Sequence, residues 1–242
     1  MPTHLWALTA KEILDQSMKQ NLGDSFRIAL SVKTFKAKKL LSEQVLWLMA
    51  NIGQGSADFF VDFDSPPESK GMRFLLRVKD GQDTQALMYL PATGRTVPLA
   101  VDEPSADLGG TGLTMDDIQG FMPKAGETAE IVKEETTEGR DCYVIRISFP
   151  GEKAVRLVWV SKNDLLVMKS EQLDADGKVK RIFRVVEFFK TDQGKEFPRE
   201  EEILIPDKNV RIRLRQDSAV FGIEMPEGVM DPEKFGTFNW RG

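Results

Sequence analysis

The chain has 242 residues, of which 41% are hydrophobic, and its formal net charge is −5 with an isoelectric point near 5.2. A chain of this length and composition can bury a core, which excludes an intrinsically disordered protein. The acidic balance argues against nucleic acid as a partner, because nucleic-acid binding needs a basic face.

The counts of two residue types narrow the chemistry further. A single cysteine, Cys142, excludes an intramolecular disulfide, and the single histidine, His4, lies in the first residues, which we expect to fray. A Ser/His/Asp triad, a Cys/His pair and a His-rich metal site therefore lack their central residue unless the N terminus folds in. We expect no catalytic residues, no metal and no cofactor, and we interpret Cys142 as a buried small side chain. No apolar run approaches the ~20 residues of a membrane-spanning helix.

The first predicted element is a helix over residues 9–21. Thr9 and Glu12 form the capping-box pattern T-x-x-E at its start, and Gly23 marks its end. The apolar residues that recur on one face of this helix are Ile13, Leu14 and Met18.

The rest of the chain has the pattern of an antiparallel β protein. Apolar and polar residues alternate from Phe26 onwards, and hairpin-type turns such as Asp176-Gly177 separate the runs. Strand patterns recur about every 12 to 14 residues, as in a meander. We expect strands at residues 26–32, 44–50, 57–63, 72–78, 85–90, 95–99, 130–136, 142–149, 155–161, 165–173, 179–189, 199–205 and 210–215.

A sheet of so many strands is expected to curl, which gives it a concave face that needs a cover. The helix at residues 9–21 is the expected cover, helped by short helical pieces at residues 114–121 and 231–235. No change in composition indicates a linker, so we expect a single domain over residues 1–242, with residues 1–7 as a terminal tail.

Residues 109–117, GGTGLTMDD, invite comparison with a phosphate-binding loop. No Lys follows Gly112, and the preceding residues are acidic and broken by proline, so no strand leads into the glycines. Asp107, Asp116 and Asp117 would also repel a phosphate. The sequence therefore argues against a nucleotide site.

Charged segments in the second half have structural and functional interpretations. Residues 200–202 are three consecutive glutamates, which alternate between the two faces of a strand and cannot converge on one site, so we expect a solvated strand. Arg211, Arg213 and Arg215 share one face and would meet either an acidic partner or lipid headgroups, or pair with Glu200 and Glu202 across strands; we favour the pairing.

Several strand segments are apolar on both faces, which is unusual for a meander with one face in water. They are residues 157–160, 182–183, 185–186 and 188–189. One face can be the covered concavity. The other face would meet a second chain, a helix whose position differs from the one predicted here, or a docking partner.

Three stretches, in this order, resemble the LolA-like family of outer-membrane lipoprotein-sorting proteins. They are MYLPATGRTVPL (residues 88–99), GGTGLTMDDIQGF (residues 109–121) and WVSKNDLLVMKSEQLDADGKV (residues 159–179), and the resemblance runs from about Leu8 to the C terminus. The chain departs from the family pattern at Leu87, Met115 and Gly112, where the family has a Trp, an aromatic residue and an acid. Asp116 and Asp117 keep the family's acidic pair.

The resemblance implies a mainly β, half-open antiparallel barrel, a single curved sheet of the LolA/LolB type with a helical lid. It implies a non-enzymatic periplasmic carrier or chaperone that transports lipoprotein acyl chains or free lipid, with a membrane transporter as a further partner. The start MPTH lacks the basic and apolar regions of a signal peptide, so the chain is either cytoplasmic or a mature form; the resemblance favours the periplasm. The alternative function is an envelope adaptor that docks on a membrane exporter or self-associates through an apolar sheet face.

The aromatic content of the strands suggests which residues face the expected hollow. We expect its wall to include Phe26, Ile28, Leu30, Tyr143, Ile145, Ile147, Leu157, Trp159, Phe183 and Val185, with Ile13, Leu14 and Met18 facing it from the lid. The glycine-rich segment corresponds to a family loop that crosses between the halves of the sheet. We expect its rim residues to be Gly109, Gly112, Thr114, Asp116 and Asp117, with Thr114 capping a short helix.

Overall fold

A computed structural model of the chain describes residues 8–53, 55–79, 82, 84–99, 107–115, 117, 126–151, 153–190 and 196–241. Its elements are α1 (Ala10–Leu22), β1 (Ser25–Lys36), β2 (Lys39–Gly53), β3 (Ser56–Ser65), β4 (Arg73–Lys79), β5 (Gln85–Leu90), β6 (Arg95–Pro98), β7 (Thr128–Thr137), β8 (Arg140–Ser148), β9 (Val155–Ser161), β10 (Val167–Leu173), β11 (Val179–Lys190), β12 (Glu196–Ile205), the 3₁₀ helix η1 (Pro206–Lys208) and β13 (Val210–Phe221). Neither helix in the described part of the chain is long and apolar enough to cross a membrane.

The helix α1 begins at the capping box that the sequence predicts. The backbone N–H of Glu12 donates to the Thr9 hydroxyl at 3.3 Å, and the Thr9 N–H donates to the Glu12 carboxylate at 2.7 Å. Gly23 ends the helix with a left-handed φ of 66°, and its N–H donates to the Lys19 carbonyl. The predicted helix is thus confirmed to within one residue at each end.

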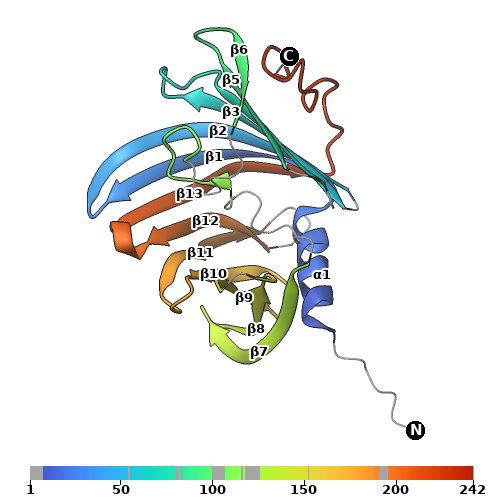
Figure 1. Cartoon of the computed structure of the whole chain (residues 1–242), viewed down its shortest axis with the longest axis vertical. Coiled ribbons are helices and arrows are strands. Elements are labelled where there is room, and N and C mark those ends of the chain that lie inside the picture. The colour runs from blue at the N-terminus through green and yellow to red at the C-terminus, as the bar shows by residue number, and fades with distance from the viewer. Residues whose placement is uncertain are drawn as a thin grey trace.

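The thirteen strands form one antiparallel sheet in the order β6-β5-β4-β3-β2-β1-β13-β12-β11-β10-β9-β8-β7. Each strand pairs with the next strand in the chain, except for β6 and β7, and β1 also pairs with β13, where Val32 lies opposite Leu214. The edge strands β6 and β7 do not pair with each other, so the curved sheet in Figure 1 is not closed. The fold is the mainly β, unclosed curved sheet that we expected.

The strand positions are confirmed, but β1, β2, β12 and β13 extend further than their alternation predicts. The β1–β13 ladder continues from Lys36↔Val210 to Phe26↔Phe221, past the point where the sequence pattern of β13 weakens. Backbone hydrogen bonds to a neighbouring strand hold a segment extended even where its side chains no longer alternate, because an unpaired buried backbone group is costly.

Side chains of alternating residues separate the two faces of the sheet. The concave face carries the largest apolar cluster, which includes Ile28, Leu46, Phe59 and Val61. The opposite face, called the convex face below, carries Met49, Phe60 and Leu75 from the same set of strands. Both faces of β2–β4 are therefore buried.

The C-terminal segment, residues 222–241, covers the convex face of β2–β5. Val229, Phe235 and Trp240 pack there against Phe60, and the Trp240 ring meets the Trp47 ring edge-on at 5.5 Å between centroids. The helical piece predicted at residues 231–235 is wrong in both form and place. Residues 232–237 form successive turns, with the Phe235 N–H donating to the Asp231 carbonyl, and they lie away from the concave face. The aromatic residues of this segment do not follow a regular spacing, so the sequence does not indicate which face of the sheet they cover.

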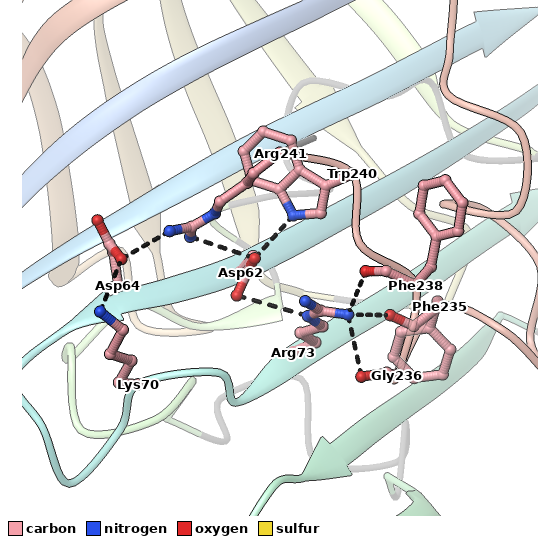
Figure 2. Close-up of polar contacts among 9 residues, drawn as sticks. All are labelled: Asp62, Asp64, Lys70, Arg73, Phe235, Gly236, Phe238, Trp240 and Arg241. Atoms are coloured by element: carbon pink, nitrogen blue, oxygen red, sulfur yellow. Dashed lines mark hydrogen bonds and ion pairs between the residues drawn. The ribbon is translucent and has the colours of Figure 1, made fainter.

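A polar cluster holds this segment in place (Figure 2). We call Asp62, Arg73, Trp240 and Arg241 the C-terminal clamp. Nη1 of Arg73 donates to the carbonyls of residues 235, 236 and 238 at 2.9, 2.9 and 2.8 Å. The Asp62 carboxylate, 2% exposed, accepts from Trp240 Nε1 at 2.7 Å and pairs with Arg241 at 3.2 Å. Buried charges are thus matched by donors and acceptors from two distant parts of the chain.

The convex face of the other half is filled from within the chain. Cys142, Val144, Trp159 and Met168 form one buried cluster against which Phe188 packs, and the Arg140 guanidinium lies 4.4 Å from the Phe188 ring centre. Phe189 points elsewhere and packs on Phe197 at 5.9 Å between ring centres. Most side chains of the segments that are apolar on both faces therefore pack within the chain, whereas Val186 is 47% exposed. Burial also raises the pKa of the Cys142 thiol.

The consecutive glutamates of β12 are not solvated as expected. Glu202 is 2% exposed, because Arg184 and Arg213 fold over it at 2.7 and 3.0 Å. Burial alone would raise the pKa of Glu202, yet hydrogen bonds from these arginines hold it below its usual value. The pairing interpretation is confirmed for Arg213, which also meets Glu200 at 3.4 Å, and for Arg211, which meets Glu202 at 3.8 Å, whereas Arg215 pairs with Asp217.

Candidate functional site

The concave face encloses an apolar cavity of about 280 Å³ between the sheet, α1 and the loop of residues 107–114. This volume is close to the lower end of the range for small-molecule sites, about 300–1,000 Å³. The apolar side chains that line it come from both halves of the sheet and from α1: Leu14, Met18, Phe26, Ile28, Leu30, Leu46, Leu48, Ile52, Phe59, Val61, Phe63, Leu108, Leu113, Ile147, Val158, Leu166, Val167, Phe183, Phe197, Ile203 and Leu214.

The structure brings about half of the expected wall to this cavity. Phe26, Ile28 and Leu30 line it from β1, and Ile147 and Phe183 line it from the other half. Leu14 and Met18 reach it from α1. Their role in ligand binding remains a proposal.

Four other expected residues share the concave face or the helix but do not line the cavity. Tyr143, Ile145 and Ile13 pack together beneath α1, which fills that part of the concavity. Val185 lies directly opposite Glu201, a cavity residue, and is therefore on the same face. The helix thus occupies one end of the concave face and leaves the middle open.

Leu157 and Trp159 lie on the convex face, contrary to expectation. The cavity side of β9 is formed by Val158 and Val160, and Trp159 instead packs with Met168. Trp159 Nε1 donates to Glu135 at 2.6 Å, and Lys169 Nζ lies 4.3 Å from its ring centre. Aromatic content was a poor guide because a polar cover can bury a tryptophan on an outer face.

The residues that β2, β3, β12 and β13 contribute to the cavity wall were not predicted from the sequence. Ile28 lies opposite Leu48, which in turn lies opposite Val61, and all three line the cavity. Directly opposed residues of antiparallel strands share a face. The face of β2 and β3 therefore follows once the register with β1 is known, although both faces of these strands are equally apolar.

The glycine-rich loop is anchored to both halves of the sheet. Thr34 of β1 and Gln44 of β2 donate to the carbonyls of Thr111 and Gly109 at 2.5 and 2.7 Å. On the other side, Arg181 of β11 donates to the Gly112 carbonyl at 3.1 Å and pairs with Asp117. The loop therefore bridges β1–β2 and β11 at the rim of the cavity, as the crossing role requires.

Two details of this loop depend on glycine and on Thr114. Gly109 has φ of 64°, and a Cβ there would come within 2.5 Å of Met72 and 2.9 Å of Phe63. The Thr114 N–H donates to the Asp117 carboxylate at 2.7 Å, a contact typical of a helix start. Asp116 and residues 118–121 of the expected short helix lie outside the described residues.

The helix α1 is held against the second half of the sheet by apolar packing and by side-chain hydrogen bonds. Ile13 is fully buried against Val158 and Ile145, and the Ser17 hydroxyl donates to the Leu165 carbonyl at 2.6 Å. Figure 1 shows α1 lying across the β7–β11 half, at the side opposite the β1–β2 turn. The first half of the sheet is not covered by the helix.

Among the carboxyl groups that line the cavity, that of Glu201 has largely apolar neighbours on the adjacent strands. Glu201 of β12 lies between Val185 and Leu214 on the adjacent strands. Burial raises its pKa to about 7, and a hydrogen bond with the buried Gln216 acts in the opposite direction. Among the described residues, no group of three or more His, Cys, Asp or Glu side chains is arranged to hold a metal ion.

Comparisons with known proteins were made at the level of sequence families and of structures. A family model described as "Uncharacterized protein" matches residues 55–235. No curated protein matches the chain by sequence.

Three solved structures have the same fold over 93% of this chain. One is a domain from Vibrio parahaemolyticus described as an outer membrane lipoprotein-sorting protein domain, with 15% identity, 97% of its own chain covered and a TM-score of 0.80. A DUF1329 family protein from Desulfovibrio piger has 15% identity, 98% coverage and a TM-score of 0.79. A LolA superfamily protein from Nitrosomonas europaea has 16% identity, 98% coverage and a TM-score of 0.68. The chain therefore has the LolA-type fold.

Proposed function

Because the chain belongs to the family whose model matches residues 55–235 and has the LolA-type fold, we propose that it is a non-enzymatic carrier for the acyl chains of lipids or lipidated proteins. The carrier would work at the cell envelope, in the periplasm, and α1 would serve as its lid. The open apolar cavity on the concave face is the observation that carries this proposal.

The energetics of an acyl chain explain why such a cavity is needed. Each methylene costs ~0.8 kcal/mol to expose, so a chain of about fourteen to sixteen carbons costs on the order of ten kcal/mol to hold in water. A wall formed by side chains such as Ile28, Leu48 and Phe183 offers a comparable apolar environment. In the first half of the sheet, β1–β6, this wall is not in contact with α1, which leaves room for an acyl chain.

Movement of α1 would enlarge the site. Its contacts with the sheet are the packing of Ala10, Ile13 and Leu14 and a few polar contacts such as that of Ser17. Leu14 and Met18 already face the cavity, so a displaced helix would still present apolar side chains to a ligand. The helix therefore suits a lid that closes over the cargo.

The adaptor alternative depends on a free apolar sheet face. Phe188 and Phe189 both pack within the chain, and the C-terminal segment covers the convex face of β2–β5. The geometry therefore favours the carrier.

The experiment that tests the carrier is binding of a fluorescent acyl probe to the wild type and to Leu48→Trp. The indole at position 48 would fill the cavity, and we expect probe affinity to fall more than tenfold. Leu41→Trp is the matched control, because Leu41 is 53% exposed at the start of β2 and should bind the probe as the wild type does. Equal binding by both variants, or no binding by the wild type, would contradict the proposal. Thermal melting of each variant establishes that the fold is intact.

A further inference from the structure

The polar part of the cavity wall is concentrated on β12 and β13. Glu201 and Gln216 both line the cavity, and their strands are adjacent. Across the ladders Glu201 lies opposite Val185 and Leu214, and Gln216 lies opposite Leu30. A carboxyl group and an amide are thus set among aliphatic side chains.

The hydrogen bonding of this pair leaves acceptors in excess. The Gln216 side chain lowers the pKa of the Glu201 carboxyl, against the effect of burial, while the buried Oε1 of Gln216 has no hydrogen-bond partner among the described residues. No ion pair to Glu201 forms within the described part of the chain, although cations lie close to its neighbours Glu200 and Glu202 on the opposite face. An acceptor held in an apolar site without a donor is unfavourable, and a ligand that brings a donor relieves this.

We propose that Glu201, positioned by Gln216, selects the polar group of the ligand: the cavity takes a single-chain or lipidated amphiphile whose ammonium or amide N–H donates to Glu201, and it discriminates against a free carboxylate. This inference rests on the proposed carrier function and specifies the ligand class of the same cavity. An ammonium or amide donates hydrogen bonds to a carboxylate, whereas a second carboxylate brings only acceptors and a like charge.

The charged groups that border the cavity do not remove this preference. Asp117 is paired with Arg181 at the rim, and Arg156 and Glu127 are the other charged side chains in the wall. The groups directly beside Glu201 on β11 and β13 are the uncharged Val185, Leu214 and Gln216. Glu201 is therefore the group whose charge a ligand meets in the middle of the sheet.

The pH dependence of binding should differ between the two ligand types. Burial raises the pKa of Glu201 to about 7, so its carboxyl is mostly ionised at pH 8 and mostly protonated at pH 6. An alkylamine stays cationic over this range. The amine should lose affinity when the pH falls from 8 to 6, and the fatty acid should gain affinity, because a protonated Glu201 can donate to its carboxylate.

The test is displacement of a bound fluorescent acyl probe by dodecylamine, dodecanamide and dodecanoic acid, each below its micellar concentration, at pH 8 and pH 6. At pH 8 we expect the amine and the amide to bind at least tenfold more tightly than the acid, and this ratio to shrink at pH 6. Glu201→Gln should bring the amine-to-acid ratio at pH 8 to within about twofold while the probe still binds.

Glu200→Gln is the matched control, because it removes one negative charge from the adjacent residue, whose side chain lies on the convex face with Arg213. It should retain the wild-type ratio. A wild type that binds all three amphiphiles equally, or a ratio that Glu201→Gln leaves unchanged, would overturn the inference and leave the carrier function standing. A wild type that binds neither the probe nor any amphiphile would overturn both.

Discussion

The strands β2 and β3 have two apolar faces, of which one is covered by other residues and the other borders the cavity. On the convex face, Met49 and Phe60 are fully buried beneath Phe235 and Trp240. On the concave face, the adjacent residues Leu48 and Val61 border a cavity. The residue types are alike, so composition does not distinguish a covered surface from a binding surface. The difference comes from a C-terminal segment that reaches one face and leaves the other open.

The cover on the convex face is most directly broken at Phe235. We expect Phe235→Ala to lower the free energy of unfolding by about 4 kcal/mol, because it leaves a cavity where the fully buried ring was. Chemical denaturation measures this loss, and acyl-probe binding measured well below the melting temperature should be unchanged. Loss of probe affinity in the folded variant would show that the two faces are coupled.

The clamp beneath that cover depends on the charge of Asp62. Asp62→Asn keeps an acceptor for Trp240 but removes the negative charge that faces the mostly buried Arg73, while Arg241 keeps its ion pair with Asp64. We expect a loss of about 3 kcal/mol in unfolding free energy. Asp64→Asn is the control, since its partners Arg241 and Lys70 are more exposed, and its loss should stay below about 1 kcal/mol. Equal losses would remove the special role of the buried carboxylate.

A pair of neighbouring truncations compares the two faces within one strand. Met49→Ala removes a side chain with no exposed surface, and Leu48→Ala removes one that already borders empty space. We expect the first to cost about 2 kcal/mol more in unfolding free energy than the second. Only Leu48→Ala should change probe affinity. Similar costs, measured by urea denaturation, would indicate that the cavity is closed up in solution.

The smallest effect is a pH dependence of stability that originates on the concave face. The pKa of Glu201 rises from about 4.5 in the unfolded chain to about 7 in the folded protein, so the folded state binds the extra proton between these values. The contribution of Glu201 to the free energy of unfolding is fully present below pH 4.5 and is lost as the pH rises through 7. Glu201 is half-buried beside a cavity, so we expect a loss of only about 1 to 2 kcal/mol. Glu201→Gln should abolish that decline relative to Glu200→Gln in denaturation at pH 5 and pH 8.

Local signals made the elements predictable. Thr9 and Glu12 mark the helix start through contacts within four residues, and turns such as Asp176-Gly177 separate strands whose alternation is visible in the sequence. The unclosed curved sheet followed from the number of strands and from the family resemblance. These inferences needed no knowledge of which distant segments meet.

Predictions failed where distant segments decide the outcome. Its aromatic ring predicts that Trp159 faces the cavity, but Glu135 on β7 and Lys169 on β10 contact it on the convex face. Residues 231–235 were assigned to the concave face, although their contacts with β2–β5 place them on the other. Glu201 was read as solvated, since nothing near it in the sequence shows that Val185 and Leu214 flank it.

The pairing of β1 with β13 has a consequence for how the chain reaches its fold. Strands β1 to β6 and β7 to β13 are two meanders of hairpins between sequence neighbours, and the β1–β13 ladder is the only seam that joins them in the described sheet. During synthesis, β1 presents an open edge until the last strand emerges, and the seam must close a loop of most of the chain. Folding is therefore expected to be slowest at this seam, and a chain cut before β13 would expose two unpaired edges that invite aggregation.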